Sequence, residues 1–335
     1  MPLALALLLV VAGLVLLTLG GEALVRGAVT LARAAGLSPA VIGLTVVALG
    51  TSLPELVVSV VAALRGQGDV TVGNVLGSNI VNLTAILGTT AIVSAIPVHR
   101  TAVRLAWPAM LAATVALLAV LGDGVVSRAE GALLVVALAA FVTFIVREAG
   151  RVVPPAADAA APPGFASRAA PAVAGDELTF AAPADGARRG WRTGAALALG
   201  AALLAAGGHA LVTGATTLAE LAGLSERVIG LTVVALGTSA PELAASLVAA
   251  RRGRTELAVT NVLGSNTINA LGVLGGAAVV HPLQVGSTFA QTDGWWMLGT
   301  ALLILPVLWS GERIGRWEGA ALVGLYVTYV IVLLS

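Results

Sequence analysis

Long apolar runs separated by short polar stretches follow one another along the whole chain. Ten runs can be marked, at residues 4–33, 38–64, 70–94, 104–121, 126–147, 192–220, 226–250, 256–280, 293–309 and 316–334. A helix of about 20 apolar residues crosses the hydrocarbon core of a bilayer. The runs contain glycine and proline and lack the alternation of strands, which favours spanning helices over an outer-membrane barrel. The pattern predicts an all-α integral membrane protein with ten transmembrane helices.

One polar interruption separates five of these segments from the other five. It covers residues 148–191 and is rich in alanine and proline with scattered charges, which is typical of a disordered linker. We expect a first five-helix repeat over residues 1–147 and a second over 192–335. The first segment lacks a basic start and a small-residue cleavage site, so we interpret it as a retained helix rather than a signal peptide.

Two phrases of the first half return unchanged in the second half. VIGLTVVALGTS at Val41–Ser52 recurs at Val228–Ser239, and NVLGSN at Asn74–Asn79 recurs at Asn261–Asn266, each 187 residues later. The chain is therefore a duplicated unit. Since each copy has an odd number of spans, the second copy enters the membrane from the opposite side, which predicts two inverted five-helix repeats.

Composition and charge support this topology. Hydrophobic residues make up 58% of the chain and charged residues 10%, which excludes an ordinary soluble domain. With ten spans and both termini outside, Arg65, Arg128 and Arg227 face outward and the other arginines lie on the cytoplasmic side with the linker, as the positive-inside rule requires. The absence of cysteine excludes disulfides and thiolate metal ligands.

Two acidic residues lie deep within predicted spans. Glu55 and Glu242 each follow a proline after the first repeated phrase. A charge at the bilayer centre costs about 2.5–3.5 kcal/mol, so a matched pair needs a functional reason. In GTSLPE and GTSAPE, the glycine and proline are expected to break the helix and release backbone carbonyls, which can coordinate cations where they line a polar cavity. The alternative is a buried, hydrogen-bonded carboxyl that stabilises helix contacts.

The second phrase supplies further oxygen atoms. Ser78 and Asn82 lie four residues apart on one predicted helix, and Ser265 and Asn269 repeat this spacing. Gly77 and Gly264 are expected to let these helices pack closely against the broken ones. Oxygen ligands select hard cations such as calcium and sodium, although such side chains also serve as helix-to-helix hydrogen bonds. No histidine cluster supports a transition metal, and His209 stands alone in the sequence, where packing is its expected role.

Charge balance indicates exchange. Two carboxylates neutralise one divalent ion or two monovalent ions, so a single site that holds both glutamates can exchange the two species. If more than two sodium ions moved for each calcium ion, the membrane potential would contribute about 2.3 kcal/mol per charge per 100 mV.

With GLTVVALGTSLPEL and NVLGSN present in two inverted copies, the chain resembles prokaryotic members of the sodium/calcium exchanger family, in the cation/calcium antiporter superfamily. The resemblance covers all ten spans and implies alternating access in a prokaryotic inner membrane, with both termini outside. It further implies that the first and sixth helices, which are long and rich in glycine, slide past a rigid core; the same glycines are also explained by close packing alone.

The resemblance also implies a ligand set. Glu55 and Glu242 would bind calcium with the backbone carbonyls of Thr51 and Thr238. The flanking sodium sites and the middle of the cluster would be formed by Ala48, Ser52, Ser78, Ala235, Ser239, Ser265, Asn82 and Asn269. Some prokaryotic relatives carry an aspartate in place of Asn269, and this chain lacks that titratable group.

Several alternatives stay open. A calcium/proton antiporter or a potassium-dependent sodium/calcium exchanger would use the same glutamates. An intramembrane hydrolase is disfavoured, because no serine or threonine has a histidine or lysine base within a span, and we expect no enzyme activity and no cofactor. A passive cation channel is a further alternative. The expected partners are calcium, sodium and lipid, with no nucleic acid and no obligatory protein.

Overall fold

The computed structural model describes residues 2–34, 48–98, 102–152, 186–251, 256–309 and 313–335. The first half contains α1 (Leu3–Ala34), α3 (Ala48–Thr51), α4 (Leu53–Leu64), α5 (Gly68–Val81), η2 (Asn82–Ile86), α6 (Leu87–Val93), β1 (Ile96–Pro97), η3 (Ala102–Ala106), α7 (Trp107–Val120), β2 (Val125–Val126) and α8 (Arg128–Val152). The second half contains α9 (Gly186–Ala222), α10 (Glu226–Ile229), η4 (Gly230–Val234), α11 (Ala235–Thr238), α12 (Ala240–Arg251), α13 (Glu256–Ile268), η5 (Asn269–Val273), α14 (Leu274–Val280), β3 (Leu283–Gln284), η6 (Phe289–Asp293), α15 (Gly294–Trp309), β4 (Arg313–Ile314) and α16 (Arg316–Leu334). The segments labelled η are π-helical.

Two helical rods form the centre of the bundle. Buried residues make up 83% of the most apolar stretch of Gly68–Val93 and 78% of that of Ala258–Val280, against no more than 33% in the other long apolar helices of the described residues. Glycine, asparagine and serine are frequent in both rods, so neighbouring helices can approach closely and polar groups meet inside the core. Apolar clusters fill the space between these rods and α7, α15 and α16.

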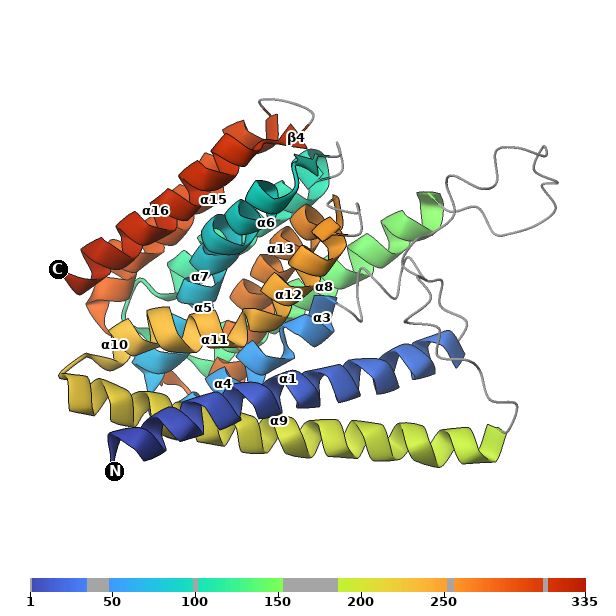
Figure 1. The fold of residues 1–335 in the computed structure, drawn as a ribbon, viewed down its shortest axis with the longest axis horizontal. Helices are drawn as coiled ribbons and strands as arrows, with labels where there is room; N and C mark the ends of the chain where they lie inside the picture. Colours follow the sequence, from blue (N-terminus) through green and yellow to red (C-terminus); the bar gives the residue numbers. More distant parts are fainter. Residues whose placement is uncertain (1, 35–47, 99–101, 153–185, 252–255, 310–312) are drawn as a thin grey trace.

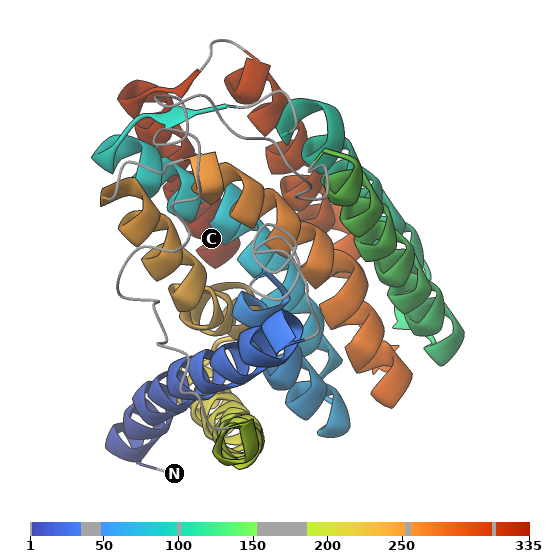
Figure 2. The same ribbon diagram turned by 90° about the vertical axis from the view of Figure 1, so that its right-hand side faces the viewer.

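Helices α1 and α9 form a separate antiparallel pair along one side of the bundle (Figures 1 and 2). The two backbones are in direct contact. A Cβ atom on Gly13 would lie 2.6 Å from the Leu211 nitrogen, and one on Gly207 would lie 2.8 Å from the Leu17 nitrogen. Close packing is thus one role of the glycines in the first and sixth helices.

Short strands join the two halves at both ends of the bundle. Strand β1 pairs with β4 and β2 with β3, both antiparallel. In each pair one strand comes from each half, and the loops that pair are those that the ten-span order places on the same side of the membrane. The all-α fold with two repeats is therefore confirmed, and the strands are the small addition that the apolar pattern did not predict.

The predicted spans correspond to helical rods in the described residues. Seven helices are long and apolar enough to cross a membrane, and Glu226–Thr238 with Ala240–Leu247 forms an eighth span bent by 40°. The other two rods are α3–α4, preceded by residues outside the described ranges, and η6–α15. Helix α8 ends at Val152 and α9 begins at Gly186, so helix extends into both ends of the expected linker; residues 153–185 are not described.

Candidate functional site

Each repeated glycine-to-proline phrase contains a helix break. Ser52 separates α3 from α4 with φ −84° and ψ 4°, and Ser239 separates α11 from α12 with φ −82° and ψ 4°. Pro54 and Pro241 follow in the first turn of the new helices, and because proline has no N–H it cannot donate to the carbonyl four residues back. The predicted break is confirmed. Ser52 lies at the break itself, as the N-cap residue of α4.

The breaks bring the two glutamates into one buried cluster. Glu55 and Glu242 are both 0% exposed and lie within range of an electrostatic interaction. Ser239 Oγ donates to Glu55 Oε1 at 3.2 Å, and Thr238 also lies beside Glu55. Thr51 lies beside the Glu242 carboxylate. Each acid is thus approached by hydroxyl groups from the opposite half.

A layer of amides and hydroxyls from the central rods lies against these broken helices. Asn269 Nδ2 donates to Ser78 Oγ at 3.2 Å, across the two halves. Asn82 Nδ2 donates to Asn266 Oδ1 at 2.9 Å. Asn269 begins η5, which packs on the Glu55 helix α4, and Asn82 begins η2, which packs on the Glu242 helix α12.

Several oxygens of the predicted ligands are buried and have no hydrogen-bond partner among the described residues. They are Ser52 Oγ, Glu55 Oε2, Asn82 Oδ1, Glu242 Oε1, Glu242 Oε2, Ser265 Oγ and Asn269 Oδ1. A buried polar atom without a partner costs about 1–3 kcal/mol, and more when it is charged. Carboxylate, hydroxyl and amide oxygens are ligands that hard cations such as calcium prefer, so these atoms fit a cation site. Within the described residues, no three acidic, histidine or cysteine side chains gather to form a metal cluster.

The remaining predicted ligands lie on the same elements. Ala235 is buried at the start of α11, where its carbonyl accepts from Ser239 N–H at 3.1 Å and from Thr238 Oγ1 at 3.3 Å. Ala48 begins α3, but its side chain is outside the described set. Gly77 makes the expected close contact, since a Cβ there would lie 2.7 Å from the Leu231 oxygen. The equivalent contact of Gly264 would be with residues that the structure does not describe.

Five π-helical segments occur among the described residues, and none of them was predicted from the sequence. Asn82–Ile86 and Asn269–Val273 are related by the repeat, as are Ala102–Ala106 and Phe289–Asp293, while Gly230–Val234 lies within the repeated phrase. A π-turn shifts the side chains that follow it and weakens the hydrogen-bond ladder, and such turns are frequent at functional sites. No residue pattern in the chain signalled them.

Four polar residues were also missed or misread. Asn79 and Asn266 hydrogen bond to each other's backbone, with distances of 3.3 and 3.0 Å, although both belong to the repeated NVLGSN phrase that could have indicated them. Asp293, at the start of a predicted span, is buried in a bidentate ion pair with Arg227, with distances of 2.6 and 2.8 Å. His209 Nδ1 lies 2.7 Å from Arg65 Nη2, a contact that was not predicted from the sequence.

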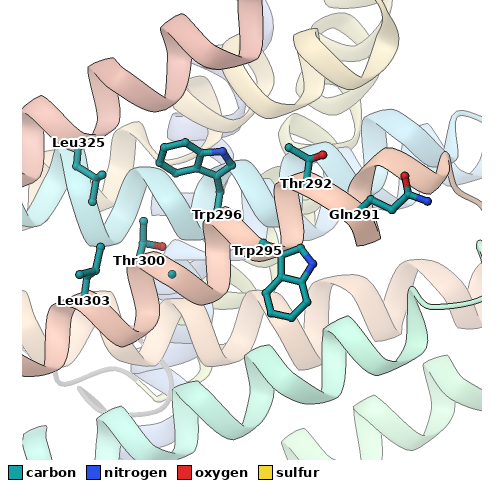
Figure 3. A pocket seen from close by; sticks show the side chains of 8 residues that line it. Gln291, Thr292, Trp295, Trp296, Thr300, Leu303 and Leu325 are labelled. Carbon is teal, nitrogen blue, oxygen red and sulfur yellow. The ribbon is translucent and has the colours of Figure 1, made fainter.

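A groove of 430 Å³ lies away from this cluster, on η6, α15 and α16 (Figure 3). Its lining includes Trp295, Trp296, Leu303 and Leu325, with Gln291 and Thr292 at one end. None of the predicted ligands lines the groove. The candidate ion site is therefore the buried cluster around the glutamates.

Comparison with known proteins decides the family. The model of the family described as "Sodium/calcium exchanger protein" matches residues 5–147 and 193–335. The chain belongs to the sodium/calcium exchanger family. It is 37% identical to the protein CaxA of Alkalimonas amylolytica over 97% of this chain and 98% of that protein. It is 35% identical to the inner membrane protein YrbG of Escherichia coli over 97% and 95% of the two chains.

Solved structures agree with this assignment. The sodium-calcium exchanger NCX_Mj, soaked with Na⁺ and Sr²⁺, is similar with a TM-score of 0.64 and 27% identity over 98% of this chain and 99% of the other. Among sequence relatives, the sodium/calcium exchanger MaX1 of Methanosarcina acetivorans is 39% identical over a stretch that covers 41% of this chain and 39% of MaX1. As a family member, this chain is a membrane antiporter of the cation/calcium class, and its family is one of transporters rather than enzymes.

Proposed function

We infer that this antiporter exchanges calcium for sodium by alternating access at the buried glutamate cluster. One observation carries the proposal: Glu55 and Glu242 come from opposite halves, are fully buried and share one site with oxygens that have no partner in the described protein. Two adjacent carboxylates without a compensating charge are unfavourable in a membrane interior. One calcium ion or two sodium ions would neutralise them equally, so the two species compete for the same charge.

The ligand roles follow from this geometry and from the resemblance. Glu55 and Glu242 would hold calcium with the backbone carbonyls of Thr51 and Thr238. Sodium would use the hydroxyls of Ser52, Ser239, Ser78 and Ser265 with the carbonyls of Ala48 and Ala235, and Asn82 and Asn269 would lie between them. The relatives named sodium/calcium exchangers support this choice of ions.

The orientation is part of the same proposal. Both termini would lie outside an inner membrane and the segment between the halves would be cytoplasmic. The pairing of β1 with β4 and of β2 with β3 supports it, because each pair requires two loops on one side, as the ten-span order places them. The arginine distribution supports the choice of side.

Calcium uptake into proteoliposomes tests the function. Vesicles loaded with sodium should accumulate radioactive calcium when external sodium is removed, at constant pH and with or without potassium. Glu55→Gln and Glu242→Gln should each lower uptake by at least about a hundredfold, because breaking a buried charge balance costs about 3–5 kcal/mol. Uptake driven by a proton gradient alone would favour calcium/proton exchange, and a strict requirement for potassium would favour the potassium-dependent alternative. Wild-type uptake in both variants would reject the glutamate site.

A further inference from the structure

A buried amide outside the proposed ligand set connects the two halves beside Glu55. Asn74 lies on α5 and is 0% exposed. Its Nδ2 atom donates to Ser59 Oγ at 3.0 Å and to the Glu55 backbone carbonyl at 3.3 Å, and its Oδ1 atom accepts from Thr238 Oγ1 at 3.0 Å. One side chain therefore contacts the helix of Glu55 in one half and the end of α11 in the other half.

The orientation of this amide follows from its neighbours. A backbone carbonyl can only accept a hydrogen bond, so the amide atom that faces the Glu55 carbonyl must be the NH₂ group. The Asn74 Oδ1 atom then faces Thr238, and because an amide oxygen has no proton, the Thr238 hydroxyl must be the donor. The Thr238 proton is thereby directed at Asn74 Oδ1, with the Ala235 carbonyl as a second acceptor at 3.3 Å.

The direction of the Thr238 proton matters for the neighbouring carboxylate. Thr238 lies beside Glu55, and a hydroxyl has only one proton to donate. Because that proton is directed at Asn74 and Ala235, Glu55 Oε2 stays buried without a hydrogen-bond partner among the described residues. An unbonded carboxylate oxygen can coordinate a cation directly, whereas one that accepts a hydroxyl proton must first give up that bond.

Close helix packing on both sides of Asn74 keeps the amide in this place. A Cβ atom on Gly73 would lie 3.1 Å from the Gly230 Cα, and one on Gly77 would lie 2.7 Å from the Leu231 oxygen. The backbones of α5 and η4 are therefore in contact one residue before Asn74 and three residues after it. If the amide is removed, α5 stays against the broken span, and the facing hydroxyl is the group that can turn.

We propose that Asn74 is a positioning residue of the ion site: it holds the Thr238 proton away from Glu55 and so keeps the Glu55 carboxylate free for a cation. The inference rests on the proposed function, because it assigns the cation to the same glutamates. Turning the proton to Glu55 would break the hydrogen bond that the buried Asn74 Oδ1 accepts. Without that amide, the proton would turn to Glu55 Oε2, since a carboxylate is a stronger acceptor than the Ala235 carbonyl.

Equilibrium binding of radioactive calcium to the purified protein tests this role. Asn74→Leu removes the amide at nearly constant size and should weaken calcium binding by about tenfold, because the cation must then displace a hydrogen bond to a charged group. Adding Thr238→Val removes the competing hydroxyl but keeps the backbone carbonyl, so the double variant should regain most of the lost affinity. A purely structural role of Asn74 predicts no recovery, because the second substitution removes one more buried contact.

Asn79→Leu is the matched control. Asn79 is also a buried asparagine of α5, but its Nδ2 atom donates to the Asn266 carbonyl at 3.3 Å rather than toward Thr238. Whatever affinity this variant loses, adding Thr238→Val should not restore it. Unchanged affinity in Asn74→Leu, no recovery with Thr238→Val, or an equal gain on adding Thr238→Val to Asn79→Leu would each overturn the positioning role. If Asn74→Leu does not fold, Asn74→Ala lacks the same acceptor and should show the same loss and recovery.

The outcomes separate this role from the exchange proposal. Binding needs no flux, so a chain that shows the loss and the recovery but exchanges no sodium for calcium in vesicles would keep the role of Asn74 and reject the exchange function. A wild-type chain that binds no calcium would reject the glutamate site and the role of Asn74 with it. Calcium binding that is present in the wild type and unchanged in Asn74→Leu would reject the role of Asn74 alone.

Discussion

The two glutamates have different surroundings despite their matched positions. Glu55 Oε1 accepts a hydrogen bond from Ser239 Oγ, whereas neither oxygen of Glu242 has a hydrogen-bond partner among the described residues. A hydrogen bond to a charged group contributes about 1.5–3 kcal/mol. Ser239 therefore stabilises the Glu55 carboxylate from the opposite half.

Ser239→Ala tests the importance of that hydroxyl. The substitution removes the donor to Glu55 and one oxygen of the proposed sodium site, so the apparent sodium affinity should fall by about tenfold. Half-maximal sodium concentrations for calcium uptake measure this effect. Thr114→Val is the control, because it removes a buried hydroxyl that donates to the Met110 carbonyl of its own helix at 3.0 Å. Equal sodium affinities in the two variants would contradict the role of Ser239.

At the scale of single residues, the two buried glutamates could be predicted, because the repeated motif places one costly charge in each half. Two buried acids at matched positions are costly, so the sequence alone indicated that they belong together. The partners of amides could not be predicted in the same way, because an asparagine side chain has two donors and an acceptor and its choice depends on which helices meet. The Asn79–Asn266 exchange was missed for this reason. The Arg227–Asp293 ion pair was missed because the two residues are 66 positions apart and meet only in the folded chain.

Among the elements, the crossing of α5 over the broken span of the second half positions the site. Gly73 and Gly230 face each other there, since a Cβ on Gly73 would lie 3.1 Å from the Gly230 Cα. Gly77 continues this contact toward Ala235. Small residues let the backbones approach, which brings Ser78 Oγ within 3.2 Å of Asn269 Nδ2 of the facing half.

Gly77→Ala should disturb this crossing. The added methyl group would lie 2.7 Å from the Leu231 oxygen and from the Ala235 Cβ, so backbone atoms must move. We expect a loss of about 1–3 kcal/mol in the free energy of unfolding, typical of overpacking, and a lower Tm in detergent. Gly299→Ala is the control, because a Cβ there meets no described atom within 4 Å. If both variants unfold at the wild-type temperature, the close crossing does not stabilise the fold.

The helix breaks could be predicted from the sequence, whereas the π-helical segments could not. Proline lacks a donor in any context, so the breaks near Pro54 and Pro241 could be predicted from the letters. The π-turns at Asn82–Ile86 and Asn269–Val273 depend on how neighbouring helices pack, and their residues form ordinary helical patterns. Such turns become visible only in the folded structure.

For the whole molecule, a pseudo-two-fold relation between the halves governs the architecture. Asn79 and Asn266, 187 residues apart, exchange equivalent hydrogen bonds, and the cross-half strand pairs repeat at both ends of the bundle. The count of spans predicted this inversion. The count could not predict how α9 packs on α4, where a Cβ on Gly208 would lie 2.8 Å from Val57 Cγ1, because the residues in this contact lie outside the repeated phrases.

The most direct test of the central claim is equilibrium calcium binding to the purified protein. If Glu55 and Glu242 form one shared site, the wild-type chain should bind one calcium ion that sodium displaces competitively. Glu55→Gln and Glu242→Gln should each abolish this binding while the protein stays folded. Two calcium ions per chain, with one retained in each variant, would show that the glutamates act separately and would contradict the account.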